Sequence, residues 1–151
     1  MLELKLTGNV PSKKNSRVRT RSGASIPNKK YYEWQTSALW QVRQQTRKRF
    51  LEPVSVEVVV VFGTKRKADI DNRLTSILDM LVEALVLRDD SWQEVPQMNV
   101  RAEYIKNQPG AFVRIKPINW EKYNRELAEI IENQPETEEC HGGCCQHASR
   151  P

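Results

Sequence analysis

The stretch that most limits how this chain can fold is VSVEVVVVF, residues 54–62. Valine and phenylalanine dominate it, and β-branched and aromatic side chains favour extended backbone. The run is too apolar to be an exposed edge strand. We therefore expect a central strand, and the rest of the chain has to supply a sheet around it.

Other segments supply that sheet and its helices. Alternating apolar and polar residues predict a strand at 2–8, and two more are expected at 97–106 and 111–118, joined by the turn NQPG. Trp34 and Trp40 are expected to pack in the core rather than to stack on bases. This order predicts the α/β (α+β) class, a single domain with a mixed β-sheet and packed helices. Helices are expected, from apolar side chains at helical spacing, at 31–50, 71–86 and 119–133.

Residues 134–151 differ in composition from the domain predicted at 1–133. They contain almost no apolar side chains, so we expect a disordered acidic tail. All three cysteines and both histidines fall in this tail, but their cramped spacing fits no zinc-finger pattern. A domain without cysteine indicates a reducing compartment such as the cytoplasm. No run approaches the roughly 20 apolar residues that span a bilayer, so no membrane partner is expected.

The charge of the chain is unevenly distributed. Residues 1–119 hold 21 Lys and Arg against 12 Asp and Glu, whereas residues 120–151 hold 3 against 7. This positive excess favours a polyanionic partner, nucleic acid first, although a basic surface is also compatible with simple solubility. Residues 10–30 contain seven basic and no acidic side chains, and their two prolines and one glycine predict a long loop. Such a loop could bind phosphates or stay solvated.

Two pairs of aspartates flank the helix expected at 71–86. Asp69 and Asp71 stand where the central strand gives way to the helix, and side chains two apart in extended backbone point the same way. Asp89 and Asp90 follow the helix, and if the turn folds back, three or four carboxylates converge on one point. Mg²⁺ suits oxygen ligands and would offset their repulsion. The residues also allow a helix capped by Asp71 and Asn72, with Asp69 solvated, and an ordinary turn at Asp89 and Asp90. A metal-dependent phosphodiesterase is therefore allowed without being required.

The segment DIDNRLTSILDMLVEALVLRDD, residues 69–90, resembles the signature of the RusA Holliday junction resolvases, a family of bacterial and phage endodeoxyribonucleases. The family's N-terminal P-x-x-x-N element is matched by Pro11 and Asn15, and the resemblance follows the order of elements over residues 2–117. It implies a RusA-like homodimer that resolves four-way DNA junctions by paired symmetric incisions in DNA recombination and repair. The matching positions of the signature are Asp69, Asp71, Asn72, Asp79, Asp89 and Asp90.

The resemblance also implies roles for individual residues. Asp69, Asp71 and Asp90 would be catalytic and would hold Mg²⁺. No organic cofactor is expected, and the protein would be cytoplasmic, encoded by a bacterium or a phage. The residues that we expect to bind DNA are Lys13, Lys14, Asn15, Arg17, Arg19, Lys65, Lys67 and Arg73.

One position departs from the family pattern. Members often carry a lysine four residues after the second aspartate, and here Thr75 stands at that position. Arg73, Lys65 or Lys67 would have to supply the missing positive charge. If none does, the alternative is a non-catalytic junction- or branched-DNA-binding protein with a weakened active site.

Overall fold

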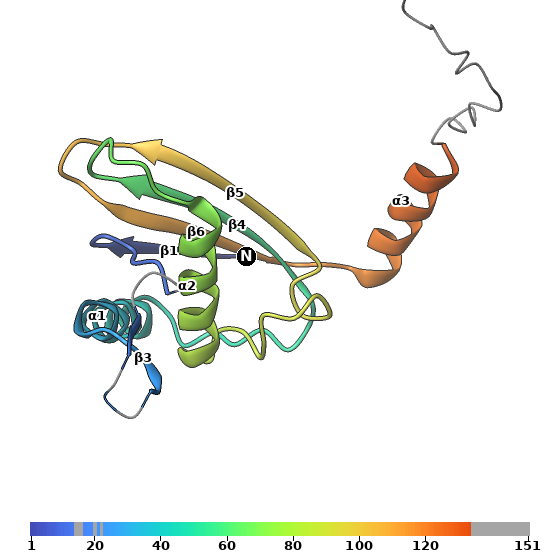
Figure 1. Ribbon diagram of the computed structural model, residues 1–151. Helices are drawn as coiled ribbons and strands as arrows, with labels where there is room; N and C mark the ends of the chain where they lie inside the picture. The colour runs from blue at the N-terminus through green and yellow to red at the C-terminus, as the bar shows by residue number, and fades with distance from the viewer. Residues whose placement is uncertain (14–16, 20, 22, 134–151) are drawn as a thin grey trace, which may run out of the picture. The chain divides into compact units, whose positions relative to one another are not determined.

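The computed structural model describes residues 1–133 except for 14–16, 20 and 22 (Figure 1). The chain divides into two compact units, Met1–Asn119 and a second unit that begins at Trp120. The tail expected at 134–151 lies outside the described residues. The first unit carries the sheet.

A four-stranded mixed sheet in the order β1-β6-β4-β5 forms the framework of the first unit. β6 runs antiparallel to both β1 and β4, and β4 runs parallel to β5. β4 therefore has a neighbour on each side, and the predicted central strand and the α+β class are confirmed. The strands are β1 (Leu2–Thr7), β4 (Val54–Phe62), β5 (Gln97–Tyr104) and β6 (Gly110–Pro117).

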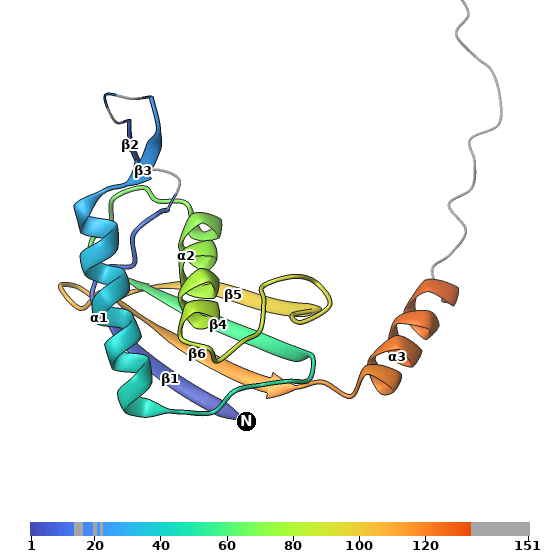
Figure 2. The ribbon, with the colours of Figure 1, turned by 90° about the horizontal axis from the view of Figure 1, so that it is seen from below.

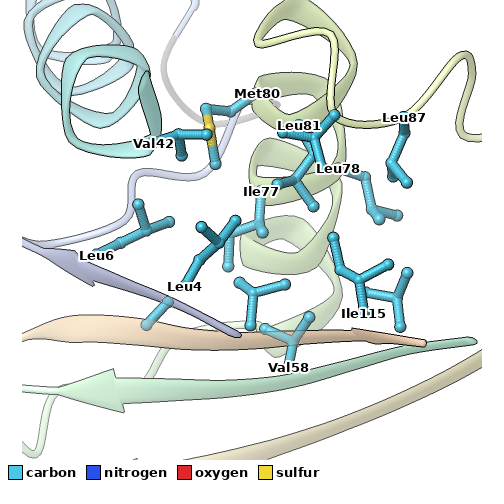
Figure 3. Packing of buried hydrophobic residues seen from close by; sticks show 14 of the residues in the cluster. Leu4, Leu6, Val42, Val58, Ile77, Leu78, Met80, Leu81, Leu87 and Ile115 are labelled. Atoms are coloured by element: carbon cyan, nitrogen blue, oxygen red, sulfur yellow. The ribbon is translucent and has the colours of Figure 1, made fainter. Parts of the chain in front are cut away.

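Two helices, α1 (Lys29–Gln45) and α2 (Ile70–Glu83), lie on the same face of this sheet (Figure 2). Figure 3 shows Leu4 and Val58 of the sheet close to Ile77 of α2, and each of the three is at most 2% exposed. Burying an aliphatic side chain of this size contributes about 1.5–3 kcal/mol to folding. This packing fixes α2, and with it both ends of the helix, relative to the sheet.

Within the described residues of the first unit, no helix covers the opposite face of the sheet. Charged side chains line it instead: the Glu57 carboxylate accepts from Lys116 at 3.0 Å and from Arg114 at 3.2 Å. The hydrogen bond from Lys116 is the largest cause of a lowered pKa at Glu57, and the charges of both cations add to it. Arg114 also donates to Glu3 at 2.8 Å. These ion pairs surround a shallow groove of about 600 Å³.

The segment before α1 is more ordered than the loop that the sequence predicts. It contains a short antiparallel hairpin made of β2 (Arg17–Arg19) and β3 (Ser25–Pro27). Strands of three residues are too short to show a period in sequence, so the pattern could not reveal them. α1 then starts with Asn28 as its N-cap, whose Oδ1 accepts from the Tyr31 N–H at 3.0 Å.

The first helix ends five residues earlier than expected. Its last residue is Gln45, and Thr46 is already extended, with φ −155° and ψ 154°. Phe50, which was assigned to the helix, turns into the core instead and is 2% exposed. Its N–H donates to the Val86 carbonyl at 2.9 Å. Tertiary packing of Phe50 therefore overrides the continued helical pattern.

The two tryptophans of α1 have different surroundings. Trp34 is buried, so the core assignment is confirmed for it, whereas Trp40 is 65% exposed and the assignment is wrong there. At 100° per residue, six positions separate the two side chains by about 120° around the helix. The buried stripe runs through Trp34 and Ala38 and leaves Trp40 on another side.

The second unit contains α3 (Trp120–Glu132), which begins directly after Asn119, the expected N-cap. None of its residues is buried, and its apolar side chains Leu127, Ile130 and Ile131 are exposed. Of the helices in the described part of the chain, none combines the length and apolar character needed to cross a membrane.

Candidate functional site

Asp69 and Asp71 lie together at the N-terminal end of α2, where the loop from β4 enters the helix. Asp69 is the N-cap residue (φ −87°, ψ 125°), yet its carboxylate makes no capping hydrogen bond. Asp71 belongs to the first turn, and both aspartates are exposed. The alternative in which Asp71 and Asn72 cap the helix does not hold, because the helix already starts at Ile70. The helix dipole favours negative charge at this end.

Asn72 contacts the first of these carboxylates from the inside of the fold. It is only 8% exposed, and its Nδ2 donates to Asp69 Oδ2 at 3.3 Å. Its buried Oδ1 has no hydrogen-bond partner among the described residues. A buried acceptor left unpaired costs about 1–3 kcal/mol, which a donor such as a metal-held water would remove. The site therefore contains one buried acceptor that no donor in the described part of the chain satisfies.

Arg73 is directed into the fold rather than toward a DNA surface. Its Nη1 donates to the Val10 carbonyl, which ties the N-terminal segment to α2. Burial lowers the pKa of the Arg73 guanidinium, and the negative charge of Asp69 opposes this shift. The positive charge of Arg73 thus acts on Asp69, the first aspartate of the pair.

Ser76 is a second tie between the N-terminal segment and α2, and sequence analysis missed it. The side chain is fully buried; its Oγ donates to the Pro11 carbonyl at 2.8 Å and accepts from the Lys13 N–H at 3.2 Å. The available signal was a serine beside Ile77 in the buried stripe of an otherwise apolar helix. A buried hydroxyl at such a place has to find partners.

Lys13 and Asp79 form the third tie. The Lys13 Nζ lies 2.6 Å from Asp79 Oδ2, and both side chains are partly exposed. This contact gives the internal aspartate of the signature a partner other than the metal. The same carboxylate faces Tyr31, whose pKa is raised to about 12, first by burial and then by the charges of Asp79 and Glu83.

Thr75 adds no positive charge next to the carboxylates. It lies one turn beyond Asp71, and its Oγ1 donates to the Asp71 carbonyl at 3.1 Å. Lys65 and Lys67 are exposed on the loop that ends at Asp69. Together with Arg66, which lies between them and is also exposed, they are the nearest exposed cations along the chain to that pair.

The remaining predicted DNA contacts lie in the segment of residues 13–19. Arg19 is exposed in β2, and the backbone of Arg17 belongs to the same strand. Lys14 and Asn15 lie outside the described residues. The three ties from α2 hold the start of this segment on the helix that carries the aspartates.

Asp90 lies at the other end of α2. The Val86 carbonyl accepts from the Phe50 N–H, and the Glu94 carbonyl accepts from the Val54 N–H, both at 2.9 Å. The turn that contains Asp90 is therefore anchored where the chain enters β4. Asp69 and Asp71, in contrast, follow the far end of that strand.

The turn after α2 does not fold back toward the start of that helix (Figure 1). α2 has 14 residues, and at 1.5 Å per residue it separates its two ends by about 21 Å. Within one chain the structure brings Asp69 and Asp71 to the same helix end, but not Asp89 or Asp90. Across the described part of the chain, no three Asp, Glu, His or Cys side chains are placed to hold a metal ion.

The pair of aspartates alone nevertheless fits a magnesium ion. Mg²⁺ is commonly bound through one or two carboxylates and keeps several of its waters. Asp69 and Asp71 offer two exposed carboxylates, and the unpaired Oδ1 of Asn72 offers an acceptor for a metal-held water. These residues would form an open and incomplete metal centre in one chain.

Comparison with known proteins identifies the family of this chain. Residues 8–116 match the family model of the endodeoxyribonuclease RusA. The chain is also similar to the crossover junction endodeoxyribonuclease RusA of Aquifex aeolicus (strain VF5), with 26% identity over 117 residues, or 77% of this chain and 91% of that protein. The matched region includes β4, β5 and nearly all of β6, the aspartate pair and the basic segment tied to α2, whereas β1 lies before it. This chain therefore belongs to the RusA family of endodeoxyribonucleases.

Proposed function

We propose that this protein is a Mg²⁺-dependent endonuclease that resolves four-way DNA junctions by paired symmetric incisions. The observation that carries the proposal is the exposed pair Asp69 and Asp71, on a helix that also anchors a basic segment. Family membership and the crossover junction activity named for the Aquifex aeolicus relative support the substrate. We place the reaction in DNA recombination and repair, in the cytoplasm of a bacterium or phage-infected cell.

A homodimer would complete the metal centre. Asp90 lies at the opposite end of α2 from Asp69 and Asp71, so it cannot share their ion within one chain. A two-fold axis that sets two copies of α2 antiparallel would bring Asp90 of the partner subunit to the pair. The same symmetry would produce two such centres, which suits a two-fold substrate and paired cuts.

The chemistry then divides between the metal and the side chains. A bound Mg²⁺ supplies charge neutralisation and an acidified water for attack on the phosphodiester. The chain holds Asp69 through the Asn72 amide and places both carboxylates at a helix N-terminus, where their charge is stabilised. Residues 1–140 contain no histidine, so no imidazole base is available in the domain.

The DNA would lie over the loop at 64–69 and the segment at 13–19. Lys65, Lys67 and Arg19 are exposed and would bind phosphates, joined by Lys13 when it leaves Asp79. Each phosphate contact releases counterions, so the affinity should fall steeply with salt. We expect Lys14, Asn15 and Arg17 to bind the same DNA.

A second candidate is a protein that binds junctions without cutting them. Thr75 favours it, because its hydroxyl donates to the Asp71 carbonyl and brings no positive charge to the carboxylate pair. In that case binding would be intact and turnover negligible.

One assay tests the proposal and separates the two candidates. Purified full-length protein is incubated with labelled four-way junction, linear duplex or single strand, each with Mg²⁺ or EDTA. The proposal expects symmetric cuts in the junction with Mg²⁺ alone, and little cutting of the other two substrates. Tight junction binding without cutting would select the second candidate, and equal cutting of junction and duplex would contradict junction selectivity.

A further inference from the structure

A small pocket lies where β4 and β5 end side by side. The two strands run parallel, and Phe62 is paired with Tyr104. Beyond them the Ile105 N–H donates to the Phe62 carbonyl and the Asn107 N–H to the Gly63 carbonyl, both at 3.1 Å. Figure 1 shows the loop from β4 to α2 next to the end of β5. The pocket of about 300 Å³ is lined by Phe62, Lys65, Arg66, Ala68, Glu103 and Tyr104.

Tyr104 presents an aromatic ring to this pocket. Paired residues of neighbouring parallel strands point to the same face, so Tyr104 shares the face of Phe62, which packs against the core under the helices. Tyr104 is 45% exposed, a large fraction for an aromatic residue on the covered face of a sheet. The Lys65 ammonium lies 5.4 Å from the ring centroid.

The pocket adjoins the carboxylate pair. Ala68 lines it and is followed directly by Asp69, so the two Cα atoms are about 3.8 Å apart. Lys65 and Arg66 border the same space and are exposed. Proteins bind single-stranded nucleic acid with aromatic rings, on which bases stack, and with cations, which hold the backbone phosphates. Both kinds of group lie here beside the aspartate pair.

We propose that this pocket takes one unpaired nucleotide of the DNA, with its base stacked on Tyr104 and its phosphate held by Lys65 and Arg66. The inference rests on the proposed function and adds a residue that selects the substrate. When DNA binds, the Lys65 ammonium leaves the face of the Tyr104 ring and contacts the phosphate. The base then stacks on the ring face that Lys65 has left. Glu103, which is paired with Val61 on the other face of the sheet, also borders the pocket. Its negative charge would repel the phosphate, so the phosphate binds on the side of Lys65 and Arg66.

The energy of base stacking explains why the ligand is an unpaired base. In a duplex, both faces of each base are stacked on neighbours, and extruding one costs a few kcal/mol. At the branch point of a junction the neighbouring stack is interrupted, so a base there reaches an aromatic ring more easily. Tyr104 would therefore favour junctions over linear duplex at a point next to the scissile phosphate.

The chain offers a closely matched control for Tyr104. Phe112 of β6 is also a half-exposed aromatic residue on a strand, at 46%, and Lys5 lies 5.7 Å from its ring centroid. It lines the groove on the opposite face of the sheet. Tyr104→Leu, Tyr104→Phe and Phe112→Leu can thus be compared in one experiment.

The experiment measures binding in EDTA, so it does not depend on cutting. The full-length variants are titrated with a four-way junction that carries 2-aminopurine at the branch point, and with linear duplex. Tyr104→Leu should bind the junction about tenfold more weakly or worse, with duplex binding unchanged, because loss of one base–aromatic stack has this size. Wild type, Tyr104→Phe and Phe112→Leu should quench the 2-aminopurine, and Tyr104→Leu should leave it bright.

Tyr104→Leu that quenches the probe and binds the junction like wild type would overturn the inference. Equal loss of junction and duplex binding by Tyr104→Leu would overturn it as well, because that result indicates a general defect. Failure of the proposed function has another signature, namely wild-type protein that does not cut junctions with Mg²⁺.

Discussion

Asp69 and Asp71 lie at the same end of α2, but their carboxylates have different surroundings. Asp69 accepts a hydrogen bond from Asn72 and is attracted by Arg73, whereas the carboxylate of Asp71 makes no hydrogen bond within the part of the chain that the structure describes. Neither carboxylate is used for capping. Both therefore remain free to share a cation, with Asp69 the more rigidly placed of the two.

We predict that Asp71→Asn abolishes cutting while junction binding survives. Asparagine keeps the shape of the side chain but removes the charge that holds Mg²⁺, so cutting should fall by about a hundredfold or more. Binding should stay equal or tighten, because repulsion of phosphate falls. Glu33→Gln, which removes one exposed charge from α1, is the control and should cut normally. An Asp71→Asn variant that cuts at the wild-type rate would remove Asp71 from the metal centre.

We predict that Thr75→Lys increases the cutting rate. The substitution places a cation one turn beyond Asp71, where it can reach developing negative charge on the phosphate. A well-placed charged donor contributes about 10²–10³ to the rate in other active sites, and an added one should give about tenfold. Single-turnover cleavage of a junction by wild type and variant measures the effect. No gain in a protein that already cuts would mean that Lys65 or Lys67 supplies the charge.

At the scale of elements, α2 joins the parts of the site. Its N-cap and first turn carry the aspartates, and its next two turns hold the N-terminal segment through Arg73, Ser76 and Asp79. Its apolar side packs on the sheet, so the helix cannot shift without cost. α1 contributes Tyr31 to this region, close to Asp79 and Glu83.

We predict that stability falls at high pH through Tyr31. Its pKa is about 12 in the folded protein, against 10.0 for the ordinary phenol. Below pH 10 the phenol is protonated in both states, and its contribution to stability is complete. Between pH 10 and 12 the unfolded chain ionises first, so the free energy of unfolding falls as the pH rises.

Urea unfolding at about pH 9 and about pH 11 measures this effect. Tyr31→Phe should lose less stability than wild type between the two pH values, while the titration of other groups is common to both proteins. Equal losses would show that Tyr31 does not titrate differently in the folded state.

The sequence predicted elements well where the signal is local. The β-branched run of residues 54–62 placed a central strand, and the spacing in residues 71–86 placed a helix that ends at Glu83. The end of α1 and the position of Asp90 could not be predicted, because each depends on distant contacts. Phe50 leaves the helix to enter the core, and Leu85, with φ 62°, turns the chain so that the following residues stay at the far end of α2.

At the scale of the whole molecule, the segment after α3 is not expected to contribute to folding or cutting. We predict that truncation after Asn133 leaves a folded dimer that cuts junctions, because the removed residues hold almost no apolar side chains. The truncation also removes Glu136, Glu138 and Glu139 against Arg150 alone. Binding at low salt should therefore stay equal or improve slightly.

Metal analysis of the full-length protein is the companion measurement. Near-stoichiometric zinc, together with lost activity of the truncated chain, would show that the cysteines and histidines of the tail have a structural role. Absence of zinc and normal cutting by the truncated chain are the expected results.

In the assembly, Asp69, Asp71 and Asp90 can bind one ion only if two subunits share each metal centre, because Asp90 lies at the opposite end of α2 from the other two. The most direct test mixes two inactive variants, Asp71→Asn and Asp90→Asn, under conditions that exchange subunits. If the centre is shared, each mixed dimer contains one intact centre, made of Asp69 and Asp71 of one subunit and Asp90 of the partner subunit. We predict that the mixture nicks junctions with Mg²⁺ although neither variant does so alone. A mixture that exchanges subunits and stays inactive would contradict it.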